Sequence, residues 1–135
     1  MGLFTSRPLK NYSAISSYFL DRRAPRKSPH QGTDWPAPRW TPIRAIFNCK
    51  VIDKGYDDVY GHWIKLRSLR KHEVLVGHMV RESTLKIGQG RRRLQTVGYV
   101  GESGAATGPH VHLSVWQLIK GRLILVDPAT FIRTH

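Results

Sequence analysis

Short runs of alternating apolar and polar residues, separated by glycine and proline, fill the chain from residue 29 onward. Successive side chains of a strand point to opposite faces, so runs of this kind give a β-strand one buried face. No segment shows the sustained helical period of apolar residues that an amphipathic helix needs. We expect strands at residues 43–47, 50–54, 62–67, 73–79, 95–99, 111–116 and 122–126, with turns at 54–58, 67–71, 88–90, 101–104 and 120–121. The spacing predicts a mainly β fold, a small antiparallel barrel or sandwich.

The length of 135 residues corresponds to one domain with one hydrophobic core. Even the apolar run at residues 123–126 is far shorter than the roughly 20 residues that span a bilayer, so we expect no membrane-spanning segment. The single cysteine, Cys49, has no partner for an intramolecular disulfide. It lies beside apolar residues, which favours a small core residue over a reactive thiol.

The charge of the chain is strongly unbalanced, with 22 Lys and Arg against 9 Asp and Glu and a net charge of +13. Such a charge attracts polyanions, and nucleic acid, an acidic membrane and the anionic polymers of a bacterial wall all qualify. The sign of the charge does not choose among them, so the choice depends on a site.

Residues 1–28 differ in composition from the rest of the chain. They carry six basic residues against one acidic residue, Asp21, and no apolar stretch typical of a signal peptide. We expect a basic N-terminal arm over residues 1–28, with a short helix at residues 12–21, and one folded domain over residues 29–135. We expect the arm to supply electrostatic attraction to an anionic partner rather than chemistry. The alternative is that Tyr12, Tyr18, Phe19 and Leu20 pack on the folded domain.

The placement of the histidines indicates a metal or acid–base site. His110 and His112 are two apart in a strand-like run, so both imidazoles project from one face. His30 and Asp34 are separated by a glycine that allows a tight turn, and nearby prolines argue against a helix. Two histidines and one aspartate are a donor set typical of catalytic zinc, which keeps a fourth position for water. For each histidine alone, a hydrogen-bonded core residue is the alternative.

Three ordered motifs carry a resemblance to a known family. They are His-x-Gly-x-Asp at residues 30–34, followed by Ala-Pro-x-x-Thr-Pro at 37–42; Val-Gly-His-Met at 76–79, similar to Tyr-x-His-Leu; and Thr-Gly-Pro-His-x-His at 107–112. From His30 to about Pro128, the chain resembles the lysostaphin-type (LytM-like) zinc endopeptidases, which cut peptide bonds in bacterial peptidoglycan. The resemblance implies the mainly β fold of those peptidases for residues 29–135.

The resemblance also implies roles for five side chains. One zinc ion would be bound by His30, Asp34 and His112, with His78 and His110 beside it as catalytic histidines. A histidine with a pKa of about 6.5 suits the removal of a proton from water at neutral pH. Which of the two acts as the base stays open. The implied activity is a zinc-dependent endopeptidase with peptidoglycan as its partner, acting at the bacterial cell wall, with a monomer favoured.

Four positions depart from the family pattern: Val76 in place of tyrosine, Trp40 and Leu94 in place of glycine, and Arg91 in place of an apolar residue. None of them is a predicted ligand, so we expect them to alter the shape of the groove and the substrate rather than the chemistry. Trp35 and Trp40 flank the first ligand motif, and they either wall a substrate groove or pack in the protein.

The alternative function is a non-enzymatic basic module that binds nucleic acid or wall polymer, with the histidines structural or holding an inert metal. The run Arg91-Arg92-Arg93 fits either a contact with such a polymer or a solvated loop. Nucleic acid is disfavoured because the sequence has no recognition helix and no aromatic RNP stretch. The small size, with no visible signal segment or wall-binding domain, suits a phage lysin or virion-associated enzyme, with a bacterial enzyme as the rival.

Overall fold

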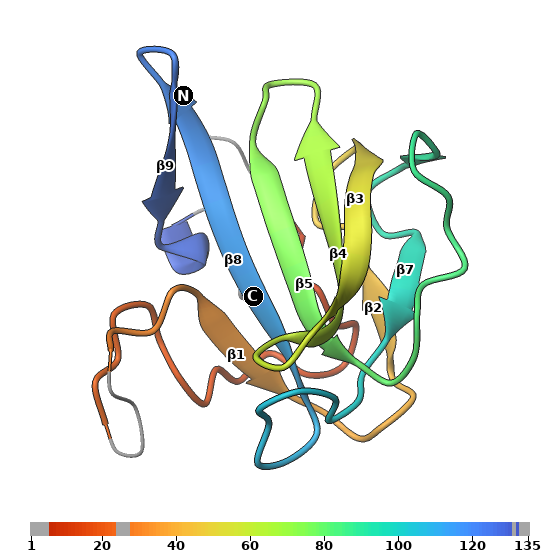
Figure 1. The fold of residues 1–135 in the computed structure, drawn as a ribbon, viewed down its shortest axis with the longest axis vertical. Helices are drawn as coiled ribbons and strands as arrows, with labels where there is room; N and C mark the ends of the chain where they lie inside the picture. Colours follow the sequence, from red (N-terminus) through yellow and green to blue (C-terminus); the bar gives the residue numbers. More distant parts are fainter. Residues whose placement is uncertain (1–5, 24–27, 131, 133–135) are drawn as a thin grey trace.

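The computed structural model describes residues 6–23, 28–130 and 132. These residues form strands and one turn of 3₁₀ helix, in an order that Figure 1 shows. The elements are β1 (Thr33–Pro36), β2 (Pro42–Arg44), β3 (Cys49–Asp57), β4 (Gly61–Ser68), β5 (Glu73–Met79), β6 (Gly90–Arg91), β7 (Thr96–Tyr99), β8 (His110–Ile119), β9 (Arg122–Val126) and η1 (Pro128–Thr130). The expected mainly β fold is confirmed. Among the described residues, no helix has the length and apolar character needed to cross a membrane.

One antiparallel sheet of seven strands dominates the fold: six follow the order β1-β8-β5-β4-β3-β6, and the seventh, β9, pairs with β8. β8 is the longest strand, and it pairs along one edge with β5 and along the other with β1 and then β9. The sheet curls into a half-barrel, and the two-stranded sheet of β2 and β7 lies on the side of β3 and β4 away from β9 in Figure 1. This arrangement leaves the first residues of β8 surrounded by β1 and by the end of β5.

The hydrophobic core lies inside the curl. Every residue of β5 is buried, because β4 and β8 flank this strand on both sides. The core joins the two sheets: Ile64 of β4 and Leu113 of β8 share it with Ile43 of β2, and all three are at most 1% exposed. Cys49 packs against the core, and burial raises the pKa of its thiol to about 11, as expected for a small core residue.

Most of the expected strands are present, and the differences have physical reasons. Residues 73–79 and 122–126 form strands with the expected bounds. The turn expected at residues 54–58 is wrong, because β3 continues to Asp57 and the chain reverses at residues 58–60. β1 was not expected, because the prolines near His30 and Asp34 argue only against a helix there. β1 pairs with β8, and its terminal Pro36 is tolerated because, among the described residues, no second strand pairs with its other edge.

The helix expected at residues 12–21 is wrong. Ser17 instead forms an antiparallel bridge with Asp34, in which the Ser16 amide donates to the Asp34 carbonyl at 3.0 Å and the Asp34 amide donates to the Ser17 carbonyl at 2.9 Å. Serine disfavours helix interiors, and the open edge of β1 offers backbone partners. Earlier in the chain, Leu9 is fully buried in the core. The boundary between an arm and a domain at residue 28 stays a prediction.

Candidate metal centre

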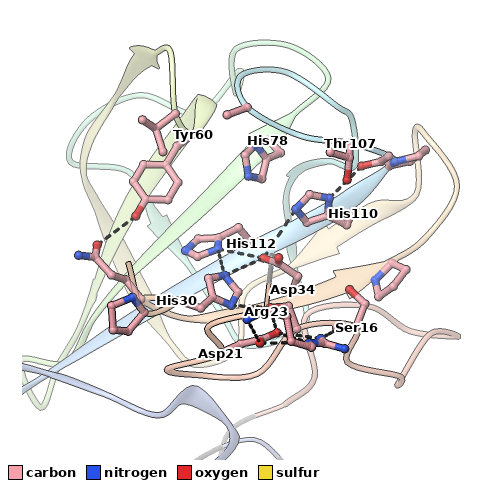
Figure 2. A pocket seen from close by; sticks show the side chains of 18 of the residues that line it. Ser16, Asp21, Arg23, His30, Asp34, Tyr60, His78, Thr107, His110 and His112 are labelled. Carbon is pink, nitrogen blue, oxygen red and sulfur yellow. Dashed lines mark hydrogen bonds and ion pairs between the residues drawn. The ribbon is translucent and has the colours of Figure 1, made fainter. Parts of the chain in front are cut away.

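Strand register brings the predicted site residues together at one end of the main sheet. In the pairing of β1 with β8, Asp34 lies opposite His112, and Pro36 lies opposite His110. In the pairing of β5 with β8, Gly77 lies opposite His112, so His78 follows directly beside them. His30 precedes β1, and its amide and carbonyl are hydrogen-bonded to Asp21 and Leu20. All five side chains therefore line one groove, as Figure 2 shows.

His30, Asp34 and His112 form a buried cluster whose ligand atoms face one another. His30 Nε2 lies 3.2 Å from Asp34 Oδ1, His112 Nδ1 lies 3.0 Å from the same oxygen, and the two ring nitrogens are 3.1 Å apart. Ligand atoms about 2.0–2.1 Å from a tetrahedral zinc ion are about 3.3–3.4 Å apart. The triangle of two imidazole nitrogens and one carboxylate oxygen thus has the size and chemistry of three corners of such a site.

Burial and hydrogen bonds set the protonation of this cluster. Burial lowers the pKa of His112 to about 4, although the hydrogen bond with Asp34 opposes this shift. Burial also disfavours the charged form of Asp34, but hydrogen bonds with His112 and His30 outweigh it and hold the Asp34 pKa well below its usual range. A neutral imidazole and an ionised carboxylate are the forms that bind metal. His112 Nε2 lies 2.7 Å from Ser114 Oγ, which fixes the orientation of the ring.

His78 and His110 lie beside the cluster and face each other, with ring centroids 4.6 Å apart. His78 Nδ1 is 2.7 Å from the Ser103 carbonyl, and His110 Nδ1 is 2.8 Å from the Gly108 carbonyl. Because a carbonyl only accepts, each Nδ1 carries a proton, and Nε2 is the atom that accepts a proton when the ring is neutral. Burial lowers the pKa of His78, against the opposing effect of its bond to Ser103, so the ring stays neutral at physiological pH.

The groove above the cluster has a volume of about 970 Å³. The N-terminal segment forms one wall with Ser16, Ser17, Asp21 and Arg23, and the other walls include Tyr60, Thr107 and Gly108. Sequence reasoning missed Tyr60, which follows β3: its ring centroid lies 5.0 Å from that of His112, and its hydroxyl donates to Gln31 Oε1 at 3.2 Å. No pattern in the sequence connects this turn residue with the histidines.

The two tryptophans beside the first ligand motif do not wall this groove. Trp35 is fully buried in the core, where its indole donates to Thr33 Oγ1 at 2.9 Å. Trp40 is 51% exposed, and its ring packs near Tyr99 and under the Arg81 guanidinium. Packing is therefore the correct alternative for Trp35, whereas Trp40 is half exposed and is not among the residues that line this groove.

Known proteins with similar sequences have peptidase names. The chain is 36% identical over 115 residues to the DD-carboxypeptidase/endopeptidase Mpg of Neisseria meningitidis, a match that covers 82% of this chain and 26% of that protein. It is 32% identical over 113 residues to the peptidoglycan DD-endopeptidase ShyC of Vibrio cholerae, covering 81% of this chain and 26% of that protein. The chain thus spans about a quarter of the length of these relatives.

Solved structures agree with the fold. A zinc-containing peptidase from Vibrio cholerae matches with a TM-score of 0.77 and 27% identity, over 91% of this chain and 39% of that one. The catalytic domain of lysostaphin from Staphylococcus simulans matches with a TM-score of 0.78 over 90% of this chain and 92% of that one; at 23% identity it shows the fold alone. The sequence also matches the peptidase family M23 over residues 28–126. On these grounds, and with the resemblance seen in the three motifs confirmed, the chain belongs to peptidase family M23.

Proposed function

We propose that this chain is a zinc-dependent endopeptidase that hydrolyses peptide bonds in bacterial peptidoglycan and acts at the cell wall. The observation that carries this proposal is the buried triangle of His30, Asp34 and His112 on the floor of a groove, with two further histidines beside it. The printed names of Mpg and ShyC support the reaction and the substrate, and the zinc-containing peptidase supports the metal. The donor set is also one that zinc prefers.

The three ligands would hold one zinc ion by His30 Nε2, one Asp34 oxygen and His112 Nδ1. When bound, zinc polarises the scissile carbonyl and lowers the pKa of a coordinated water toward 7. The remaining steps belong to the chain. One of His78 and His110 accepts the proton of the attacking water at Nε2, and that proton later passes to the leaving amine. The other, when it carries a second proton at Nε2, can donate a hydrogen bond to the substrate oxygen that gains negative charge.

A non-enzymatic basic module is not favoured, because all five side chains are present and converge in one groove of a peptidase fold. The finer role of a lysin that lyses bacteria, whether of phage or of bacterial origin, stays a prediction. It requires that the enzyme open cross-links in intact walls as well as in fragments.

The proposal is tested with the full chain, purified and assayed for zinc by elemental analysis and for hydrolysis of purified peptidoglycan. We expect about one zinc per chain, and cleavage that a chelator abolishes and added zinc restores. Mass spectrometry of fragments released from peptidoglycans of defined chemistry identifies the bond that is cut. A chain that holds no zinc and leaves every defined wall unchanged, while a known wall peptidase digests the same samples, contradicts the proposal.

A further inference from the structure

The imidazole of His30 is fixed on both of its nitrogens. Nε2 faces Asp34 and His112 in the cluster. Nδ1, on the opposite side of the ring, lies 3.1 Å from the Tyr18 carbonyl and 3.0 Å from Ser17 Oγ. Because the carbonyl only accepts, Nδ1 carries the proton and Nε2 presents its lone pair to the cluster. Residues 17 and 18 therefore select the tautomer that can bind a metal.

Ser17 connects this imidazole to a carboxylate. Its hydroxyl donates to Asp21 Oδ2 at 2.8 Å, so an oxygen lone pair of Ser17 can accept from His30 Nδ1. The Asp21 carboxylate is held in turn by Arg23, whose Nη2 lies 2.7 Å from Oδ2. Hydrogen bonds from Arg23 hold the pKa of Asp21 well below its usual range, so the carboxylate stays ionised. A carboxylate, a hydroxyl and an imidazole thus form one chain of hydrogen bonds.

The same segment, residues 16–23, which we name the strap, also holds the backbone of two ligand residues. Its bridge with Asp34 contributes two backbone hydrogen bonds. Two more flank His30: the Leu20 amide donates to the His30 carbonyl at 2.8 Å, and the His30 amide donates to the Asp21 carbonyl at 3.0 Å. Arg23 closes the strap on itself, with Nη2 2.8 Å from the Ser16 carbonyl. The strap therefore pairs with the backbone of β1 at Asp34 and with that of His30, two of the three proposed ligands.

We propose that Ser17, supported by Asp21, is a positioning residue that orients His30 and strengthens its hold on the metal; this rests on the proposed function. The carboxylate end of the hydrogen-bond chain makes Nε2 a better electron donor, and the strap keeps the ring from rotating out of the cluster. Hydrogen-bond partners behind a metal-binding histidine are typically worth 10–100-fold in metal affinity. The N-terminal segment then belongs to the metal centre and is more than an electrostatic tether.

The test compares Ser17→Ala and Asp21→Asn with the unmodified full chain, and with Ser13→Ala, an exposed serine outside the strap. The zinc dissociation constant is measured by competition with a chelator, and the absorption spectrum of the cobalt-substituted protein reports the ligand geometry. We expect about 10–100-fold weaker zinc binding and shifted cobalt bands for Ser17→Ala. Asp21→Asn gives a smaller loss in the same direction, and Ser13→Ala matches the unmodified chain.

Melting curves of the metal-free proteins separate positioning from folding. If Ser17→Ala lowers the melting temperature strongly, the Asp21→Asn variant decides between positioning and folding. Weaker zinc binding by Asp21→Asn, with an unchanged melting temperature, supports the proposal. The proposal for Ser17 is overturned if both variants have the zinc affinity and the cobalt spectrum of the unmodified chain. This holds even if the unmodified chain binds zinc and cleaves peptidoglycan, as the proposed function expects. If the unmodified chain itself binds no zinc, the proposed function fails first, and the role of Ser17 fails with it.

Discussion

His78 has a left-handed backbone, with φ of 60°, at the penultimate position of β5 beside the cluster of His30, Asp34 and His112. Its amide donates to the Tyr60 carbonyl at 2.6 Å, which anchors this unusual conformation to the turn after β3. Histidine tolerates positive φ better than most residues, and such strained positions concentrate at functional sites. The conformation directs the imidazole across the groove toward His110.

Single substitutions at the histidines separate metal binding from catalysis. We expect His112→Ala to lose both zinc and activity, because it removes a ligand. His78→Ala and His110→Ala should keep zinc and lower kcat by about two to four orders of magnitude, the usual worth of positioned acid–base and oxyanion groups. Elemental analysis and turnover of a soluble peptide measure the two effects. If His110→Ala empties the site and His112→Ala does not, the roles within this pair are exchanged.

Two of the departures from the family pattern also have left-handed backbones: Trp40 with φ of 73° and Leu94 with φ of 77°. Glycine adopts this conformation without strain, which explains why the family commonly has glycine there. Other residues lose roughly 1–2 kcal/mol in it. Trp40 gains contacts with Tyr99 and Arg81 in return, whereas Leu94 is 47% exposed.

Leu94→Gly should therefore stabilise the protein. Relief of about 1–2 kcal/mol of strain exceeds the roughly 0.4–1 kcal/mol by which glycine favours the unfolded chain, so we expect a gain of about 0.5–1 kcal/mol. Thermal and urea unfolding measure it. The control is Leu69→Gly, at an exposed leucine that is not among the positive-φ residues of the described chain, where glycine should destabilise. An unchanged or lower free energy of unfolding for Leu94→Gly contradicts the strain argument.

At the scale of whole elements, the sequence predicted the strands with strongly apolar runs and the candidate site better than the short strands β1 and β6. The bounds of β5 and β9 were predicted because strongly apolar runs end at clear turns. The candidate site was predicted because its five residues stand in three ordered motifs. β1 and β6 were missed because short edge strands form by pairing with a partner, and their sequences lack an apolar alternation of their own.

The N-terminal segment shows why contacts between residues far apart in the sequence were not predictable. Ser17 approaches His30 only because the edge of β1 accepts residues 16 and 17 as a pairing partner. Nothing in the local sequence indicates this contact, and a short helix was expected in its place. The expectation of an electrostatic arm followed from composition and stays a prediction, whereas the contacts of Leu9 and Ser17 could not be predicted from composition.

Leu9 provides a test of whether the N-terminal segment is part of the folded domain. Its side chain is fully buried, so Leu9→Ala should lower the free energy of unfolding by about 2–5 kcal/mol. Tyr12→Ala, at a residue of the same segment that is 37% exposed, should have a much smaller effect. Urea unfolding of both variants measures the difference. Equal stability of Leu9→Ala and the unmodified chain would mean that the segment is a detachable tether.

At the scale of the molecule, positive charge gathers at the end of the main sheet away from the metal centre. A groove of about 750 Å³ there is lined by Lys50, Arg67, Lys71, Arg91 and Arg92, and no aspartate or glutamate is among its described lining residues. Glu73 lies nearby and pairs with Arg67 at 2.8 Å. β5, with His78 near one end and Glu73 at the other, separates the two grooves by roughly 20 Å.

Replacement of Arg91, Arg92 and Arg93 by alanine should weaken binding to intact anionic walls and leave zinc content and cleavage of a soluble peptide unchanged. Removal of three charges elsewhere, by alanine at Lys10, Lys120 and Arg122, is the matched control and should have a smaller effect. The difference in wall binding between the unmodified chain and the triple-arginine variant should shrink between about 0.1 M and 1 M salt, because the Debye length falls from about 10 Å to about 3 Å. Sedimentation of the protein with purified walls measures the bound fraction. An equal loss of wall binding in both variants would show that only net charge matters.

The position of β8 has a consequence for biosynthesis. His112 pairs with Asp34 across 78 residues of sequence, and β8 also joins β1 and β9 to β5. A ribosome that adds about 5–20 residues per second takes roughly 4–16 s to travel from one ligand to the other. During that interval the nascent chain has a histidine and an aspartate of the cluster but no complete set of three ligands. On the proposed function, the metal-binding set is therefore incomplete until β8 has been synthesised, and the strand that joins β1 to β5 also supplies the last ligand.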